Sequence, residues 1–422
     1  MSDTFCNLPW IQQYISTSGK HRICCMNSDN ITKNDGYHQF NMIRDKITDS
    51  WNSEYVKDMR LKMITGERHP NCQRCYMQED AGHISLRNTH QMEKLIKNTN
   101  SDGSYDTPPA FLELHFGNLC NLSCKMCSQN YSTTIGKELL KMGEKDPEFL
   151  KWVKKESGIV NNWTGQLDMV YDWFKNDKIK KEVFQHVSNN VTGLNVIGGE
   201  PTVIKEFWEL FEYLEQKDTL KNKDVLIHSN MTNINPKLTK WLGNMRSWSI
   251  VASIDGLGDR NRYIRYPSDW NTIVKNINFY TEVKKKEMNG YINFGPAIQL
   301  LNIDQLVDLC IFFEQISPDS NSIGFYSHVK YPIICDYDIA PTDYKLKVAE
   351  HLESLLKQIT NERYYKDILT HINGLRQETF TEERKKQYQK MFVKYNDIQD
   401  KFRSNTKTWR ELLPALEKSI GL

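Results

Sequence analysis

The sequence predicts an α/β protein whose central part is a partial (β/α)6 barrel of the TIM type, with a cysteine-rich module before it and helices after it. Short apolar runs with strand character alternate with helical segments in the middle of the 422-residue chain. Strands that alternate with helices indicate parallel βαβ units. The predicted strands span residues 111–116, 192–197, 224–228, 248–254, 292–298 and 322–327.

Length and charge restrict the class of protein. A chain of 422 residues is long enough for two or three domains. Its formal net charge of +2 gives no overall field that would favour a nucleic acid or an anionic membrane as partner. We find neither a signal peptide nor an apolar run that could span a bilayer, and the clustered cysteines fit metal binding in a reducing cytosol. We therefore expect a cytoplasmic protein without a membrane partner.

A polar run over residues 97–110, rich in turn-forming residues, marks a domain boundary. We expect an N-terminal module over residues 1–100, the barrel over 108–330 and a helical C-terminal region over 331–422. Between the first two barrel strands, residues 144–187 exceed the length of one crossover and predict an inserted helical lobe. In the C-terminal region, the charge run of the helix predicted over 381–402 is most simply a solvated face.

The N-terminal module predicts a hairpin, a helix and a set of thiols. An alternating stretch to Ile15 meets a polar turn at 17–20 and a return strand, which is typical of a hairpin. Ser53 and Gly66 are suited to begin and end a helix. The available thiols are those of Cys6, of Cys24 or Cys25, of Cys72 and of Cys75. Four thiols suit tetrahedral zinc as well as an iron–sulfur cluster.

Three cysteines follow the first barrel strand at spacings of four and three. They are Cys120, Cys124 and Cys127. Because a cubane cluster has four irons, three thiolates from one loop leave the fourth iron open to another ligand. A buried helix face or a structural zinc site are the alternatives. Gly117 and Asn118 argue against a helix through this segment, and the neighbouring residues do not obviously supply a fourth zinc ligand.

This loop resembles the signature loop of radical S-adenosylmethionine (radical SAM) enzymes. It departs from the family pattern at Met126, where an aromatic residue usually precedes the last cysteine. The resemblance implies a [4Fe-4S] cluster whose open iron is chelated by S-adenosylmethionine. It also implies reductive cleavage of this cofactor to a 5′-deoxyadenosyl radical, with electrons from a reductant such as flavodoxin or ferredoxin.

Further motifs follow later strands in the order of this family. Gly198, Gly199 and Glu200 follow the second strand and resemble the motif that binds the methionyl amino group. Glycines let the backbone approach a ligand closely, and a carboxylate can accept a hydrogen bond from an ammonium. The segment from Ser253 to Asp255, after the fourth strand, resembles the ribose-binding segment.

Two more residues complete the expected cofactor site. Arg265 is the candidate for the cofactor carboxylate, and Asn230, after the third strand, fits a further contact more loosely. The alternatives are a solvated charge for Arg265 and a simple turn at Asp255 and Gly256.

The N-terminal module resembles the SPASM and twitch modules of radical SAM enzymes, which carry auxiliary iron–sulfur clusters. In those modules the ligand lies five residues after the turn glycine, here Gly19, which selects Cys24 over Cys25. The resemblance implies one auxiliary cluster on Cys6, Cys24, Cys72 and Cys75, with zinc as the alternative. Two features depart from the family: the module precedes the barrel, and it has fewer cysteines than a full SPASM domain.

Polar side chains on the barrel strands could line its lumen and position a substrate. Glu113 and His115 share one face of the first strand, and His228, Gln299 and His328 lie in or beside later strands. Hydrogen-bonded polar groups of the core are the alternative for each.

Radical SAM proteins with such auxiliary modules often modify peptides or proteins, so we expect a radical SAM enzyme with that class of substrate. The alternatives are radical modification of RNA or of a small metabolite, and a non-enzymatic iron–sulfur or zinc protein. An assay of S-adenosylmethionine cleavage distinguishes the enzymes from a non-enzymatic metal protein.

Overall fold

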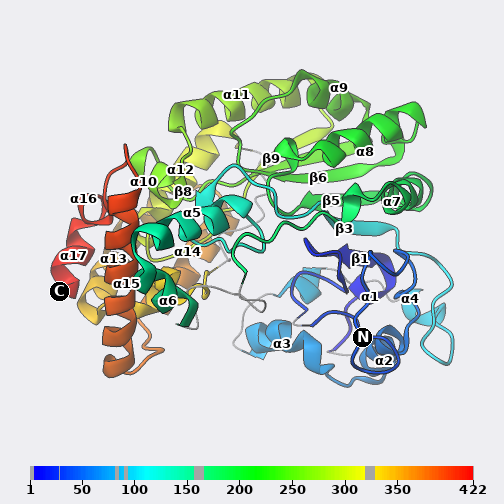
Figure 1. Cartoon of the computed structure of the whole chain (residues 1–422), viewed down its shortest axis with the longest axis horizontal. Coiled ribbons are helices and arrows are strands. Elements are labelled where there is room, and N and C mark those ends of the chain that lie inside the picture. Colours follow the sequence, from blue (N-terminus) through cyan, green and yellow to red (C-terminus); the bar gives the residue numbers. More distant parts are fainter. Residues whose placement is uncertain are drawn as a thin grey trace. The chain divides into compact units, whose positions relative to one another are not determined.

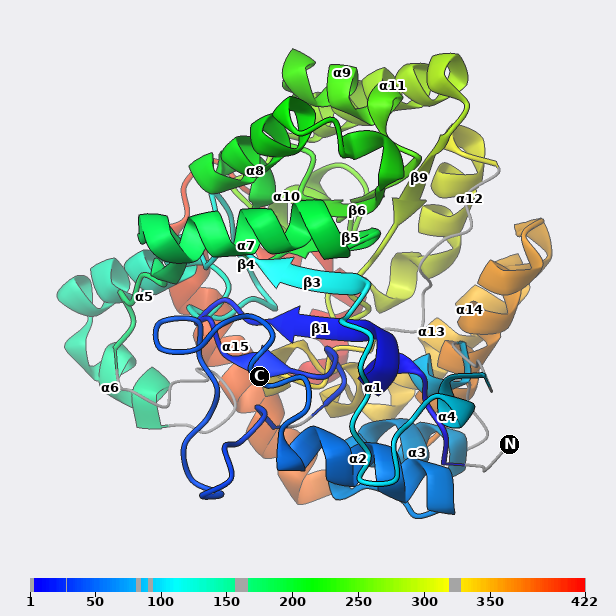
Figure 2. The same ribbon diagram turned by 90° about the vertical axis from the view of Figure 1, so that its right-hand side faces the viewer.

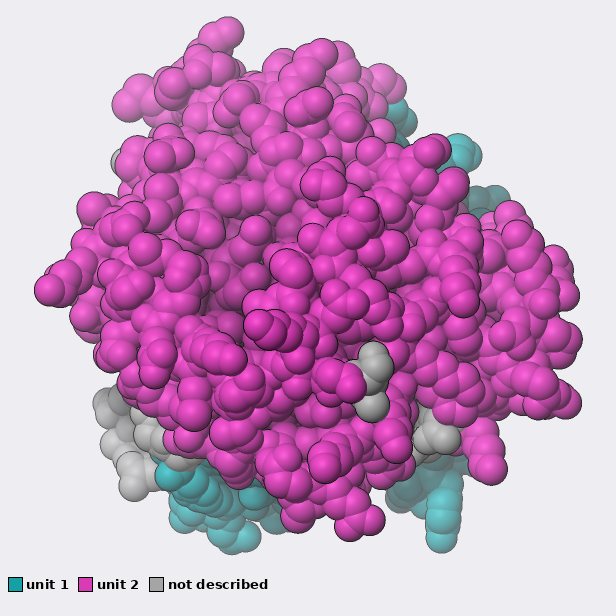
Figure 3. Space-filling model, turned by 90° about the vertical axis from the view of Figure 1, so that its left-hand side faces the viewer, with its two compact units in different colours: residues 1–118, 170–227, 244–248 teal, residues 119–169, 228–243, 249–422 magenta. Residues whose placement is uncertain are grey.

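The computed structural model describes residues 4–27, 29–80, 85–89, 94–155, 166–318 and 328–421. The chain forms two compact units (Figure 3). Unit 1 comprises residues 1–118, 170–227 and 244–248, and unit 2 comprises residues 119–169, 228–243 and 249–422. The division falls inside strands β6 (Asp224–Ser229) and β7 (Ser247–Ala252), so each unit contains part of both.

Unit 1 is built on a mostly parallel sheet. Its strands lie in the order β2 (His21–Arg22), β1 (Gln12–Ile15), β3 (Phe111–His115), β5 (Gly193–Ile197) and β6. The pair β1–β2 is antiparallel and forms the predicted hairpin, whereas β1–β3, β3–β5 and β5–β6 are parallel. Strand β1 of the N-terminal module lies directly beside the first barrel strand (Figure 2). This pairing was not foreseen from the sequence.

Helices of the N-terminal module enclose an apolar core. They are α1 (Leu8–Ile11), α2 (Glu54–Thr65), η1 (Pro70–Cys72), α3 (Gln73–Asp80), η2 (Leu86–Thr89) and α4 (Lys94–Lys97). The predicted limits of α2 are confirmed: Ser53 is its N-cap, and Gly66 ends it with a left-handed φ of 87°. Phe5, Val56 and Met59 are fully buried in this core. Apolar burial of this kind is the main force that fixes a small module.

Further helices of unit 1 connect the barrel strands. These are η3 (Trp173–Lys175), α7 (Asp177–Asn190), η4 (Pro201–Val203), α8 (Lys205–Gln216) and η5 (Leu220–Asn222). Helix α8 links β5 to the parallel β6, which is the predicted βαβ unit. Leu210, Phe211 and Leu214 of α8 are fully buried.

Unit 2 contains the cysteine loop and the later part of the barrel. Strands β4 (Ser123–Cys124) and β8 (Arg265–Tyr266) form an antiparallel pair, and β9 (Gly290–Phe294) neighbours β7. The helices and 3-10 turns in this part are α5 (Thr133–Lys145), α6 (Pro147–Lys155), α9 (Pro236–Asn244), α10 (Asp259–Ile264), α11 (Trp270–Glu287), η6 (Ile303–Gln305) and α12 (Leu306–Ile316). Cys310 is buried on α12 as a core residue.

The C-terminal region is helical, as predicted (Figure 1). Its elements are η7 (Ile333–Cys335), η8 (Tyr337–Ile339), α13 (Thr342–Leu355), η9 (Leu356–Gln358), α14 (Glu362–Leu375), α15 (Glu382–Phe402), α16 (Trp409–Leu412) and α17 (Pro414–Ile420). Helix α15 has an exposed charged face, but its other face is buried and carries polar residues, among them Lys385, Asn396 and Gln399. Each makes hydrogen bonds within the protein, which compensates for its loss of water.

Five of the six predicted strands are present as β3, β5, β6, β7 and β9, with ends shifted by up to four residues. The sixth, over residues 322–327, lies outside the described residues, as does part of the predicted helical lobe at 156–165. Among the helices that the structure describes, none has the length and apolarity needed to cross a membrane.

Candidate iron–sulfur and cofactor sites

The cysteine loop of unit 2 is fixed at both ends. Before it, Gly117 has a φ of 105°, and an added Cβ would lie 2.4 Å from the carbonyl oxygen of Tyr171, so only glycine fits. After it, the Ser132 side chain caps α5 and donates a hydrogen bond to the Leu122 carbonyl at 2.6 Å. The cysteines thus lie on the predicted strand-to-helix loop, with the short strand β4 inside it.

The three thiols of this loop lie in a mostly buried environment. Cys124 is buried, and Cys120 and Cys127 are half-buried. Burial raises the pKa of the Cys124 thiol, and the guanidinium of Arg265 opposes this effect. The Leu122 amide donates to the Cys120 sulfur at 3.4 Å. Burial therefore disfavours a free thiolate at Cys124. A coordinating metal would displace the thiol proton and stabilise the thiolate.

Arg265 joins the cysteine loop to the segment after β7. Its Nη1 lies 4.0 Å from the Cys124 sulfur, and its Nε lies 2.7 Å from Oδ2 of Asp255. The second contact is an ion pair between two buried atoms. The other oxygen of Asp255 accepts a hydrogen bond from the Ala297 amide at 2.7 Å. Both oxygens of the Asp255 carboxylate thus have a partner within the protein.

Asn230 also lies at the cysteine loop. Its Nδ2 donates to Oδ1 of Asn121 at 2.8 Å, and Asn121 donates in turn to Thr232 at 2.9 Å. This amide pair ties the segment after β6 to the loop between Cys120 and Cys124. Ser253 is half-buried after β7, and its amide donates to the Ser229 carbonyl at 2.9 Å.

Unit 1 carries the Gly-Gly-Glu turn after β5. Gly198 has a φ of 95°, and an added Cβ would lie 2.9 Å from the Cβ of His115, so this position requires glycine. Glu200 is buried, and its Oε1 accepts hydrogen bonds from the amide and hydroxyl of Thr202, which starts η4. The backbone of this turn is thus preorganised.

Two of the predicted lumen residues form a buried pair beside this turn. His115 Nε2 lies 3.4 Å from Glu113 Oε1, and Gln12 Nε2 lies 3.5 Å from the other carboxylate oxygen. Both residues lie on β3 and share one face, as predicted.

Four cysteines of the N-terminal module line one cavity. They are Cys6, Cys24, Cys72 and Cys75. Cys25 is exposed and is not among the lining residues. Leu8, Ile23 and Met63 complete an apolar wall, and burial raises the pKa of both Cys6 and Cys72 to about 12. Such thiols are protonated unless a metal binds them.

A cation in this cavity wall was missed from the sequence. Arg87 donates to the Phe5 carbonyl at 2.8 Å and pairs with Glu79. Its charge lowers the pKa of Cys6 and Cys72 against the larger effect of burial. Only the fold brings Arg87 to the cysteines, since it lies outside their motif.

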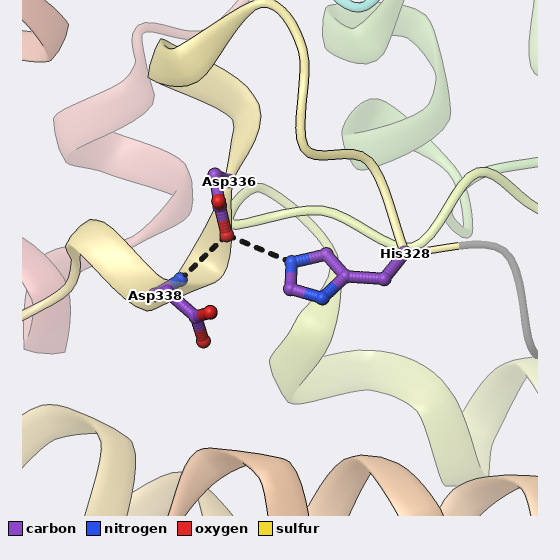
Figure 4. A group of neighbouring side chains, drawn as sticks. All are labelled: His328, Asp336 and Asp338. Atoms are coloured by element: carbon purple, nitrogen blue, oxygen red, sulfur yellow. Dashed lines mark hydrogen bonds and ion pairs between the residues drawn. The ribbon is translucent and has the colours of Figure 1, made fainter. Parts of the chain in front are cut away.

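His328, also a predicted lumen residue, lies in a group with Asp336 and Asp338 (Figure 4). His328 Nε2 is 2.8 Å from Asp336 Oδ1, which also accepts from the Asp338 amide at 2.9 Å. The Lys330 ammonium lies 2.6 Å from Asp338 Oδ2. Because an ammonium already neutralises the carboxylates, we interpret this group as an ion-pair network.

Comparison with protein families finds two domains in this chain. The model of the radical SAM superfamily matches residues 114–310, and that of the SPASM iron–sulfur cluster-binding domain matches residues 6–76. This chain contains a radical SAM domain and a SPASM domain. Both predicted cysteine sets of this radical SAM protein lie inside the matched ranges, and its SPASM domain precedes the barrel, as the sequence indicated.

Solved structures of Streptococcus suis SuiB are similar to this radical SAM protein. The form bound to S-adenosylmethionine is 16% identical, with a TM-score of 0.30, and covers 72% of this chain and 62% of its own. A further SuiB structure is 14% identical, with a TM-score of 0.33 and the same coverage. SuiB bound to the precursor peptide SuiA is 15% identical, with a TM-score of 0.31, and covers 69% of this chain and 53% of its own. This chain therefore spans less than two thirds of those chains. No curated protein matches it.

Proposed function

We propose that this chain is an enzyme that cleaves S-adenosylmethionine reductively to a 5′-deoxyadenosyl radical and uses it to modify a peptide or protein. The observation that carries the proposal is the loop with three cysteines and a buried guanidinium against Cys124. Three thiolates leave one iron of a cubane for the cofactor. When bound, the cluster supplies the electron for the cleavage, and a reductant such as flavodoxin or ferredoxin would deliver it.

Residues of the chain would hold and orient the cluster and cofactor. The cluster ligands that we propose are Cys120, Cys124 and Cys127. Arg265 and Asp255 pair with each other, and Arg265 Nη1 lies 4.0 Å from the Cys124 sulfur, which supports a place for both beside the cluster and cofactor. The Ser253 hydroxyl suits the ribose, while the contacts of Asn230 favour a role in positioning the loop.

The Gly-Gly-Glu turn is proposed to bind the methionyl ammonium. Gly198 and Gly199 would let the backbone approach the cofactor, and the Glu200 carboxylate would accept the hydrogen bond. Glu200 is held by Thr202, so its carboxylate has a defined position.

An auxiliary iron–sulfur cluster is proposed in the N-terminal cavity, on Cys6, Cys24, Cys72 and Cys75. The match of residues 6–76 to the SPASM iron–sulfur cluster-binding domain supports a cluster over zinc. The position of Cys24 in the cavity wall, with Cys25 exposed, supports Cys24 as the ligand.

The peptide or protein substrate rests on the family of the N-terminal module, because radical SAM proteins with such modules often act on peptides. We further propose the domain limits 1–100, 108–330 and 331–422. The clustered free thiols support a cytoplasmic location.

The decisive experiment is an assay of cofactor cleavage. After anaerobic reconstitution, the protein should bind about eight irons, four for each cubane. With reductant it should convert S-adenosylmethionine to 5′-deoxyadenosine and methionine, slowly without substrate. A variant with Ala at Cys120, Cys124 and Cys127 should retain about four irons and lose the activity.

Absence of deoxyadenosine from protein with a verified three-cysteine cluster, under several reductants, would refute the proposal in favour of a non-enzymatic iron–sulfur protein. For the substrate, deuterium transfer from candidate labelled peptides into deoxyadenosine is the direct measurement. Transfer from RNA or a metabolite instead would support those alternatives.

A further inference from the structure

Lys125 lies inside the cysteine loop, directly after Cys124, yet its side chain is almost fully buried. Its backbone amide donates to the Ile264 carbonyl at 2.8 Å, next to the β4–β8 pair. A buried ammonium is expensive unless several acceptors surround it. The hydrogen-bond partners of Lys125 therefore show which elements hold this loop in place.

The acceptors for this ammonium come largely from the C-terminal helix α15. Lys125 Nζ lies 2.6 Å from Gln399 Oε1 and 2.7 Å from Asn396 Oδ1. It also lies 2.9 Å from the hydroxyl of Tyr263 and 4.1 Å from the centre of that ring. The side-chain amides of Asn396 and Gln399 lie more than 270 residues after Lys125 in sequence. They nevertheless contact the loop between the proposed iron ligands Cys124 and Cys127.

The end of α15 makes a second connection to the loop. Arg403, the C-cap of α15, donates from Nη2 to the Ser123 carbonyl at 2.6 Å. Its Nε and the Nε2 of Gln399 both donate to Oε1 of Glu138, at 3.0 and 2.6 Å. Glu138 belongs to α5, which begins just after the loop. One helix face therefore holds the residues on both sides of Cys124 and the helix that follows.

The contacts between α15 and the cysteine loop are polar and directional, which distinguishes them from simple apolar packing. A helix face that only covered the barrel would be apolar, whereas this face carries an arginine and two amides that the loop satisfies. Within such a buried network, removal of one member leaves the others without partners, so its geometry is strongly determined.

We propose that Asn396, Gln399 and Arg403 are positioning residues that clamp the cysteine loop onto α15. The clamp keeps two cations buried beside the cluster site: Lys125, whose Nζ lies 3.9 Å from Asp400, and Arg403, which pairs with Glu138. A cluster with three thiolate ligands gains negative charge on reduction, so nearby buried cations raise its reduction potential. This last effect rests on the proposed function, because it requires a cluster at Cys120, Cys124 and Cys127.

The clamp itself can be tested without a cluster, by hydrogen exchange of the full-length protein before reconstitution. Gln399→Met and Asn396→Leu remove acceptors of Lys125 and should raise exchange of the amides at residues 120–127 at least about tenfold, as local opening becomes easier. Asn396→Asp keeps an acceptor and should preserve protection. Lys390→Met, on the exposed side of α15, is the control and should change nothing. Unchanged exchange in both Gln399→Met and Asn396→Leu would overturn the clamp.

The electrostatic effect is measured after reconstitution. Lys125→Met should make the potential of the three-cysteine cluster more negative in a redox titration followed by EPR. The auxiliary cluster serves as internal reference, and Lys390→Met should leave both potentials unchanged. An unchanged potential in Lys125→Met would refute the electrostatic part. If the wild-type protein binds no cluster at this loop, the proposed function fails, and the exchange result alone decides on the clamp.

Discussion

The guanidinium of Arg265 lies 2.7 Å from the carboxylate of Asp255 and 4.0 Å from the sulfur of Cys124. Two residues that the sequence assigned to cofactor binding are thus in direct contact, and one of them reaches a proposed iron ligand. Arg265 therefore has a structural role in addition to any contact with the cofactor.

Asp255→Asn should destabilise the protein by about 3–5 kcal/mol, because it leaves the Arg265 charge buried and unpaired. Urea unfolding of the apo protein measures this effect. The matched control is Arg246→Gln, which removes a largely exposed ion pair with Asp224 and should cost at most about 1 kcal/mol. Equal losses in the free energy of unfolding would show that the Asp255–Arg265 pair contributes no more to stability than an exposed ion pair.

Glu200→Gln should weaken binding of S-adenosylmethionine by roughly tenfold or more, since it removes a charge-assisted hydrogen bond worth about 1.5–3 kcal/mol. The amide oxygen of Gln can still accept from Thr202, so the turn should persist. Equilibrium binding measures the affinity, and the cluster absorbance should not change. Wild-type affinity in this variant would exclude the proposed role of Glu200.

Cys24→Ala should empty the auxiliary site and lower the iron content to about four per chain. Cys25→Ala should leave about eight, because Cys25 is exposed and lies outside the cavity lining. Iron analysis of the reconstituted proteins compares the two. If Cys25→Ala instead loses the auxiliary iron, the ligand assignment must be exchanged. Zinc bound in place of four irons would support the zinc alternative.

Protonation of His21 should destabilise the N-terminal module at low pH. Burial lowers the pKa of His21 to about 3, and the Asp45 carboxylate opposes this only in part. The unfolded chain, with a pKa of about 6.5 for this group, binds the proton first. Its contribution to stability is therefore complete above pH 6.5 and is lost as the pH falls towards 3, by up to about 1.4 kcal/mol per pH unit.

Urea unfolding of apo protein between pH 7 and pH 4 tests this pH dependence. His21→Gln cannot take up the proton but can still hydrogen-bond Ser50, the partner of His21 Nδ1, so its stability should fall less steeply. The exposed His351→Gln is the control and should follow the wild-type curve. If the free energy of unfolding depends on pH equally in His21→Gln and the wild type, protonation of His21 is not the cause of the pH dependence.

The sequence by itself predicted the radical SAM domain and the auxiliary module, and it determined most of the local structure. The spacing of Cys120, Cys124 and Cys127 fixed the type of cluster loop because ligand spacing is a local property of the backbone. Limits such as Ser53 and Gly66 of α2 were predictable for the same reason, since caps depend on a few adjacent residues.

The tertiary structure alone decided which distant residues meet. Pairing of β1 with β3, the place of Arg87 in the cavity wall, and the contacts of Lys125 with Gln399 join residues far apart in sequence. No local sequence pattern predicts such pairs. From the sequence alone, a charged residue is expected to be exposed to solvent, because its partners are not known. Burial of a cation is decided by the acceptors that the fold brings to it, and here α15 supplies them from the opposite end of the chain.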